Sequence, residues 1–245
     1  MDRKKKVSFD KDNFKANYKT MVGRITYLIP LLFILFSCTK EKALEPLLEI
    51  RYGLHERHVM DFKYASSTCY LFIHGGAWAM GDKSDWYGID EVICRKGYSY
   101  ASMNYRLSNE TDWKGMDSDV GLCISKLKYL GIKKVILVGS SAGSTIALVH
   151  GLKGYDVISI STISRTDTLL CNNLYSYARK YGEVNLWDSA FANNVTLVHG
   201  DMDYITDIEQ SRAIARKGHK LHVVKGVAHD FTREQMHELF EFLIK

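Results

Sequence analysis

The chain has 245 residues, of which 46% are hydrophobic and 25% charged, and its formal net charge is +5. This balance suits one large globular domain and argues against a disordered or collagen-like chain. Residues 1–37 hold eight Lys or Arg and three Asp, so this leader accounts for the whole positive excess. Because the remainder is near neutral, the net charge does not indicate a nucleic-acid partner, and none is expected.

The leader has the pattern of an export signal. A basic segment that ends at Arg24 precedes the apolar run 27–36, which is too short for an ordinary membrane-spanning helix. The run ends in Leu-Phe-Ser-Cys, which resembles a bacterial lipobox, where cleavage precedes the cysteine and a lipid is attached to it. We therefore expect a cell-envelope lipoprotein held to the membrane through Cys38, with 38–46 as a tether. An uncleaved anchor helix is the alternative, and Met21 is an alternative start.

Residues 47–245 are expected to form one α/β domain. Apolar alternation predicts two strands joined by a turn, at 47–52 and 58–64, as an antiparallel edge. A continuous apolar strand, a helix and another strand follow at 68–73, 84–96 and 98–104.

The second half of the domain continues the alternation of strands and helices. Asp117 or Ser118 is expected to cap a helix that reaches Tyr129. Thr232 and Gln235 form a capping box at the start of the last helix. Between these helices the sequence predicts a strand from Lys134, a helix at 141–152, strands at 157–161 and 195–199, a helix at 208–217 and a strand at 220–224.

This alternation predicts a mostly parallel, twisted sheet of about eight strands with helices on both faces. In such sheets ligands bind beyond the carboxyl ends of the strands. Residues 162–194 are predicted to be irregular and to form a short lid, with Leu169, Leu170, Leu174, Tyr175, Tyr177, Tyr181 and Trp187 as its apolar side chains. The same side chains could instead pack against the sheet.

A nucleophile is expected where the strand from Lys134 ends. The strand runs into Gly139-Ser140-Ser141-Ala142-Gly143, and a helical pattern follows. Only Ser141 has glycine two residues before and two residues after it, as the Gly-x-Ser-x-Gly pattern requires. Such a turn holds the serine in a strained conformation and projects its hydroxyl above the sheet, ready to attack a carbonyl carbon.

A serine hydroxyl needs a base to take its proton, and the base works best when a carboxylate orients it. Two segments downstream of Ser141 offer such groups at strand ends. His199-Gly200-Asp201-Met202-Asp203 follows one strand, and Gly226-Val227-Ala228-His229-Asp230-Phe231 follows the last strand.

Together with His74-Gly75-Gly76 after the strand at 68–73, these motifs resemble the serine esterases and lipases of the α/β-hydrolase fold. The resemblance covers the chain from about Tyr70 to its end, and the order Ser, Asp, His is that of the family. It implies that His229 is the general base and that Asp203 is the acid. Asp201, which is closer to the strand end, is the alternative acid.

The family also implies an oxyanion hole. Its donors should be the backbone N–H of Ala142, at a helix N-terminus, and those of Gly75 and Gly76, where the missing side chains let the backbone approach substrate. His74 should shape this loop. Ala77 stands where the family often has a third glycine, which leaves the number of donors open.

The resemblance implies hydrolysis of carboxylic esters with small acyl or aromatic groups through an acyl-enzyme, with no metal and no cofactor. His-Gly-Gly-x-Trp is also similar to the related formamidases, which cleave an N-formyl amide of an aromatic amino acid, and Trp78 is expected to bind substrate. A lipid-anchored binding protein of the same fold that has lost turnover is the third hypothesis.

Overall fold

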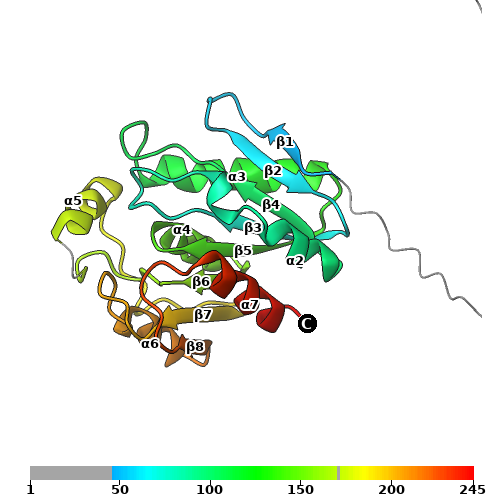
Figure 1. Cartoon of the computed structure of the whole chain (residues 1–245). Coiled ribbons are helices and arrows are strands. Elements are labelled where there is room, and N and C mark those ends of the chain that lie inside the picture. Colours follow the sequence, from blue (N-terminus) through cyan, green and yellow to red (C-terminus); the bar gives the residue numbers. More distant parts are fainter. Residues whose placement is uncertain (1–45, 170–171) are drawn as a thin grey trace, which may run out of the picture. The chain divides into compact units, whose positions relative to one another are not determined.

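The computed structural model describes residues 46–169 and 172–245, with the side chains of 172–175 and 177 outside that description. It contains one eight-stranded sheet in the order β1-β2-β4-β3-β5-β6-β7-β8 (Figure 1). The strands are β1 (Leu48–Arg51), β2 (Val59–Lys63), β3 (Thr68–Ile73), β4 (Ser99–Met103), β5 (Lys134–Ser140), β6 (Asp156–Ile160), β7 (Val195–Gly200) and β8 (Lys220–Val224).

The edge hairpin is antiparallel and the rest of the sheet is parallel. β2 pairs antiparallel with both β1 and β4, whereas the pairs among β3 to β8 are all parallel. Ile73 at the end of β3 pairs with Gly139 near the end of β5. The His-Gly-Gly loop and the Gly-x-Ser-x-Gly turn therefore leave the sheet side by side, which only their pairing register determines.

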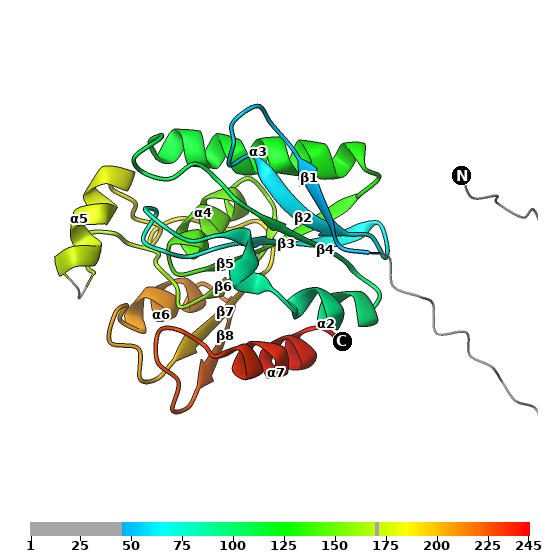
Figure 2. The ribbon, with the colours of Figure 1, turned by 45° about the horizontal axis from the view of Figure 1, so that its top comes forward.

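Helices cover both faces of the sheet (Figure 2). Leu137 of β5 belongs to the apolar cluster that includes residues of α3, α4 and α6, and Val138 belongs to the cluster that includes residues of α2 and α7. Neighbouring strand residues thus face opposite layers, as the pleat of a strand requires. The helices are η1 (Lys83–Trp86, a 3₁₀ turn), α2 (Ile89–Arg95), α3 (Trp113–Tyr129), α4 (Ala142–Gly151), α5 (Asn172–Tyr181), α6 (Glu209–Ala215) and α7 (Arg233–Leu243).

The structure confirms the predicted α/β fold and differs from the sequence prediction in three helices. The helix expected at 84–96 is divided, because Gly88 between η1 and α2 has a φ of +89°. Helix α3 begins at Trp113, since Asp112, and not Asp117, accepts a hydrogen bond from Gly115 N and caps it. Helix α5 lies within the segment predicted to be irregular, where the buried pair Ala178 and Tyr181 is too short a pattern to indicate a helix.

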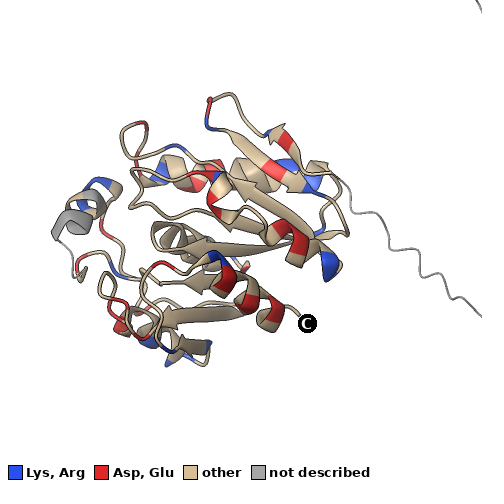
Figure 3. Cartoon of the chain, in the orientation of Figure 1, with Lys and Arg blue, Asp and Glu red and all other residues tan. Residues whose placement is uncertain are grey.

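Charged residues of both signs are mixed over the helices and loops around the central strands (Figure 3). In the described part of the chain, no helix combines the length and the apolar character that crossing a bilayer would need. The signal-like leader and Cys38 lie outside the described residues, as do Leu170 and Cys171. Cys69, Cys94 and Cys123 are free thiols buried among apolar side chains.

Candidate active site

Ser141 stands in the sharp turn between β5 and α4, with φ 51° and ψ −119°. A left-handed φ is rare for a residue with a side chain, so this turn is strained. The flanking glycines make the turn possible. A Cβ on Gly139 would lie 2.2 Å from Gly143 O, and a Cβ on Gly143 would lie 2.3 Å from Ile73 O. Both contacts are with backbone, so neither neighbour can move aside cheaply.

The structure brings together the three residues predicted as nucleophile, base and acid. His229 Nε2 lies 2.8 Å from Ser141 Oγ, and His229 Nδ1 lies 2.8 Å from Asp203 Oδ2. These two contacts require His229 to accept the serine proton at Nε2 while its Nδ1–H donates to the carboxylate. Ser141 and His229 are 8% and 7% exposed, and both line the cavity described below.

Asp203 accepts hydrogen bonds from other donors besides His229. Its Oδ1 accepts hydrogen bonds from the backbone N–H groups of Ile205 and Thr206, and its Oδ2 accepts one from Thr206 Oγ1. His199 Nε2 lies 3.3 Å from the same oxygen. Burial raises the pKa of Asp203, but the hydrogen bonds from His199, His229 and Thr206 outweigh it and hold the pKa well below its usual range. The group is therefore a carboxylate at neutral pH.

The alternative acid, Asp201, is engaged elsewhere. It is exposed, and its Oδ1 accepts a hydrogen bond from Gly226 N. This contact fits a carboxylate that stabilises a turn.

Two further contacts hold the His229 loop in place. Ser161, at the end of β6 with φ 48°, donates its hydroxyl to His229 O at 2.6 Å. Gly200 lies so close to the same loop that a Cβ there would be 2.1 Å from Val227 O. Ser161, Thr206 and His199 were not predicted from the sequence as parts of the site. These three residues reach the site through contacts across the sheet, although His199 itself lies in the segment 199–203 that was predicted to hold the acid.

The predicted oxyanion donors belong to segments that adjoin Ser141. Ala142 is the first residue of α4, so its N–H has no partner within the helix. Gly75 and Gly76 follow β3 and line the same cavity as Ser141. A Cβ on Gly75 would lie 3.2 Å from Ser141 Cβ, a tight contact that glycine avoids.

His74 lies beneath this loop. Its side chain is fully buried and stacks on Tyr105, with ring centroids 4.3 Å apart, and its Nδ1 lies 2.8 Å from Gly75 O. Burial lowers the pKa of His74 to about 4, and the nearby Arg57 charge acts in the same direction. The imidazole is therefore neutral at pH 7.

The structure corrects the expectation for Trp78. Its side chain is fully buried and stacks on Tyr181 of α5, with ring centroids 4.6 Å apart. It does not line the cavity beside Ser141, because positive φ angles at Ala77 and Trp78 turn the chain back toward the core. None of the described residues of 162–194 lines this cavity either, and a lid function for that segment stays a prediction.

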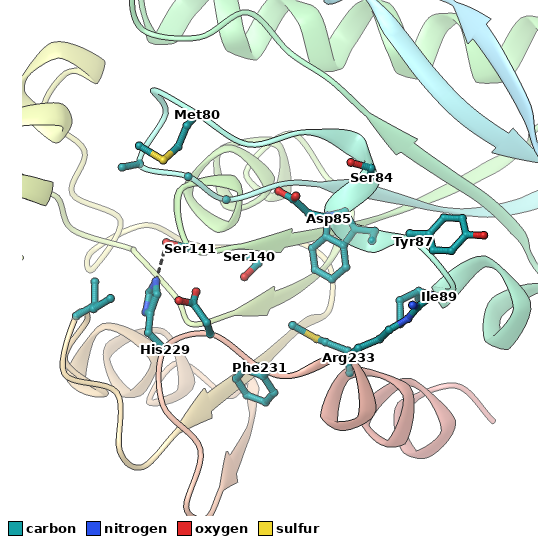
Figure 4. Close-up of a pocket in the computed structure, with 17 residues that line it drawn as sticks. Met80, Ser84, Asp85, Tyr87, Ile89, Ser140, Ser141, His229, Phe231 and Arg233 are labelled. Carbon is teal, nitrogen blue, oxygen red and sulfur yellow. Dashed lines mark hydrogen bonds between the residues drawn. The ribbon is translucent and has the colours of Figure 1, made fainter.

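The cavity that contains Ser141 and His229 has a volume of about 530 Å³. Figure 4 shows Ser141 and His229 at one end and Tyr87 and Arg233 at the other. Its walls come from the segment 75–89 and from the segment 229–236, together with Ser140, Ser141 and Ile205. Three of its side chains are aromatic, namely Trp86, Tyr87 and Phe231. Apart from Gly75, Gly76, Ser141 and His229, these lining residues were not predicted from the sequence.

Metal chemistry was not expected for this site. Across the described ranges, no three or more His, Cys, Asp or Glu side chains are grouped so that they could hold a metal ion.

A protein-family comparison matches the BD-FAE family over residues 61–188, which is more than half of the chain. The chain belongs to the BD-FAE family. The matched region includes the His-Gly-Gly loop and the turn at Ser141, but the BD-FAE match stops before Asp203 and His229.

Solved structures with the same fold as this BD-FAE member include several esterases. Esterase B from Lactobacillus rhamnosis is 18% identical with a TM-score of 0.65, covering 80% of this chain and 82% of that one. An esterase/lipase from an uncultured bacterium is 16% identical with a TM-score of 0.63, covering 82% and 84%. A bifunctional GH43-CE protein of Bacteroides eggerthii is 17% identical with a TM-score of 0.63, covering 79% of this chain and 37% of that one.

Among curated proteins, the BD-FAE member matches the FAD-linked oxidoreductase pytB of Aspergillus terreus, with 29% identity over 98 residues. The match covers 38% of this chain and 12% of that protein, so the chain spans a small part of the length of this curated relative.

Proposed function

We propose that this protein is a serine hydrolase that cleaves carboxylic esters of small acyl or aromatic substrates through an acyl-enzyme. The observation that carries the proposal is the position of His229, whose two ring nitrogens each lie 2.8 Å from the proposed partner, Ser141 Oγ on one side and Asp203 Oδ2 on the other. Membership of the BD-FAE family and a fold shared with solved esterases support it.

In the first half of the reaction, Ser141 Oγ attacks the ester carbonyl carbon and its proton moves to His229 Nε2. The negative charge then lies on the carbonyl oxygen, which accepts hydrogen bonds from the N–H groups of Ala142, Gly75 and Gly76. Asp203 stabilises the positive charge on His229. When the tetrahedral intermediate collapses, His229 gives its proton to the departing alkoxide and the acyl group remains on Ser141.

In the second half, water takes the place of the alcohol. His229 Nε2 accepts a proton as the water oxygen attacks the acyl carbon, and the same three N–H groups hold the oxyanion. Collapse breaks the bond to Ser141 Oγ, and the proton returns from His229 to the serine oxygen. The products are the acid and a free enzyme.

The size and lining of the cavity support small or aromatic substrates. A volume of about 530 Å³ lies within the range of small-molecule sites, and Trp86, Tyr87 and Phe231 provide flat apolar surface. Among fold neighbours, esterase B was inhibited by a tributyrin phosphonate and EstE5 was soaked with p-nitrophenyl butyrate. Short acyl chains are therefore the first substrates to test.

The experiment measures hydrolysis of p-nitrophenyl esters by the wild-type protein and by its Ser141→Ala variant. The acyl chains range from about two to about twelve carbons, which covers the lengths that a cavity of this size could hold. We expect activity that falls with acyl length and is lost in the variant. Ser140→Ala is the matched control, because Ser140 is the neighbouring serine but lacks the spacing of the nucleophile. Equal hydrolysis by the wild type and Ser141→Ala would overturn the mechanism.

An arylformamidase reaction remains the second candidate, because the aromatic walls of the cavity would also suit an N-formyl aromatic substrate. N-formylkynurenine in the same assay distinguishes the two. A kcat/KM for the formamide far above that for every aryl ester would favour it. A folded wild type that turns over neither class would favour the non-catalytic binding protein.

We further propose that the mature protein is attached to the bacterial cell envelope through a lipid on Cys38. The support is the sequence pattern around residues 35–38, which lie outside the described structure. Expression of the full chain with radiolabelled fatty acid tests this proposal. The wild type should carry label and partition with membranes, and Cys38→Ala should carry none. Equal labelling of the two proteins would contradict it.

A further inference from the structure

We propose that Arg57 is a positioning residue of the oxyanion hole, which acts by fixing the His74 ring and both ends of the loop 74–81. The inference rests on the proposed function, since it concerns the donors Gly75 and Gly76. Arg57 belongs to the turn between β1 and β2, about 20 residues before this loop in the chain. No sequence motif connects the two segments.

The guanidinium of Arg57 spans the base of the loop. Its Nη2 donates to Gly81 O at 2.9 Å and lies 3.3 Å from His74 Nε2, so one nitrogen contacts both ends of the loop. Its Nε donates to Tyr105 O at 2.7 Å. Tyr105 in turn donates its hydroxyl to His74 O at 3.0 Å and stacks on the His74 ring. The rigid planar fork of arginine suits this arrangement of three acceptors.

Arg57 and Gly75 O together select which nitrogen of His74 carries the proton. An arginine can only donate, so His74 Nε2 must accept. The neutral ring then carries its proton on Nδ1, which donates to Gly75 O at 2.8 Å. The low pKa of His74, about 4, means that this neutral form is present throughout the neutral pH range.

The His74 hydrogen bond orients a proposed oxyanion donor. Gly75 C=O and Gly76 N–H belong to one planar trans peptide, so they point in opposite directions. While Nδ1–H holds Gly75 O beside the buried ring, the Gly76 N–H is directed away from it. Both glycines line the cavity that contains Ser141.

Loss of Arg57 removes this control. The Nε2–H tautomer of His74 then becomes accessible, and in that form the lone pair of Nδ1 faces the lone pairs of Gly75 O. This repulsion favours rotation of the Gly75–Gly76 peptide, which would turn the Gly76 N–H away from the oxyanion. Gly81 is packed tightly beneath the ring, since a Cβ there would lie 2.4 Å from His74 Nδ1. Gly75 O therefore cannot avoid the repulsion by a shift of the ring toward Gly81.

The test compares the wild type with Arg57→Met, which keeps the chain length but has no donors, and with Arg57→Lys, which keeps the charge. Arg51→Met is the matched control, because Arg51 lies in the same hairpin, is exposed, and donates to His55 O of that hairpin at 3.3 Å. Active sites are titrated with an aryl phosphonate, so that kcat refers to folded, reactive protein.

We expect Arg57→Met to lower kcat about 100-fold with KM changed less than about twofold, because the oxyanion is bound in the transition state and not in the ground state. Arg57→Lys should recover part of the loss, and Arg51→Met should match the wild type. An unchanged kcat in Arg57→Met, a rise in KM alone, or an equal loss in Arg51→Met would each overturn the proposal.

A second measurement does not depend on catalysis. Nitrogen NMR of ¹⁵N-histidine protein distinguishes the two neutral tautomers, and a His74→Asn sample assigns the signal. The wild type should show His74 protonated at Nδ1 alone, and Arg57→Met should show a population protonated at Nε2. An Nδ1–H ring in both proteins would refute the role of Arg57 even if the wild type hydrolyses no ester. If Arg57→Met shows the expected tautomer change relative to the wild type but the wild type has no turnover, the proposed function has failed and the role of Arg57 has not.

Discussion

The substitution Gly143→Ala tests whether the turn at Ser141 and the His-Gly-Gly loop are packed as one unit. A Cβ at this position would lie 2.3 Å from Ile73 O and 2.5 Å from His74 O. Ordinary contacts of a methyl group lie more than about 1 Å farther out, so either helix α4 or the end of β3 must move by about that distance. Ile73 is fixed by its pairing with Gly139, which leaves little room for the strand to yield.

Two consequences follow from this displacement. Overpacking of a close-packed site costs about 1–3 kcal/mol of stability. A shift of about 1 Å between Ser141 and the donors of the loop should also lower kcat/KM by about 100-fold. Urea unfolding measures the first effect, and hydrolysis of p-nitrophenyl acetate measures the second.

Gly121→Ala is the control for Gly143→Ala. Gly121 lies in the middle of α3, and a Cβ there meets no atom within 4 Å. Alanine is favoured over glycine within a helix by about 0.5–1 kcal/mol, so this variant should be slightly more stable and fully active. If Gly143→Ala kept its activity and lost less than about 0.5 kcal/mol, the account of the turn would be wrong.

Three further predictions concern carboxylates. Asp203→Asn should lower kcat by about 10⁴-fold at pH 7, because the base loses the carboxylate that orients it. The kcat of Asp201→Asn should stay within about tenfold of the wild-type value. Steady-state kinetics of the two variants decides which aspartate is the acid. The pKa of Asp117 is lowered from 3.8 to about 2, where burial is outweighed by hydrogen bonds from a buried histidine and a lysine. Its contribution to stability is therefore present above about pH 4 and is lost as the pH falls toward 2, and Asp117→Asn should flatten that part of an acid-unfolding curve; an unchanged slope would contradict this. Arg106→Met should cost about 3–5 kcal/mol in urea unfolding, because Asp119, with a fully buried side chain, would lose its bidentate partner; a loss below about 1 kcal/mol would show that the carboxylate is compensated otherwise.

Much of the fold could be predicted because its signals are local. The strand at 68–73 agrees with the sequence, since a continuous apolar run bounded by polar residues leaves few alternatives. The last helix begins after Thr232, where the capping box identifies its start. The start of α3 was predicted wrongly, because Asp112, Asp117 and Ser118 are all possible caps by residue type.

The candidate site likewise contains residues that the sequence could predict and residues that it could not. Ser141, Asp203 and His229 could be chosen because each lies in a short motif at a strand end. Trp78 could not be placed, because its aromatic type suits a pocket wall as well as a core, and only packing against α5 decided between them.

The strands and the three chemical motifs therefore follow from the sequence, because periodicity and motif spacing act over a few residues, whereas helix α5 and the break at Gly88 do not. Tertiary structure alone decided which segments face Ser141. It placed η1 and the start of α7 around the cavity and brought Arg57, from the edge hairpin, beneath the loop at His74. Such contacts depend on the pairing register and on the packing of distant side chains, and no local pattern encodes them.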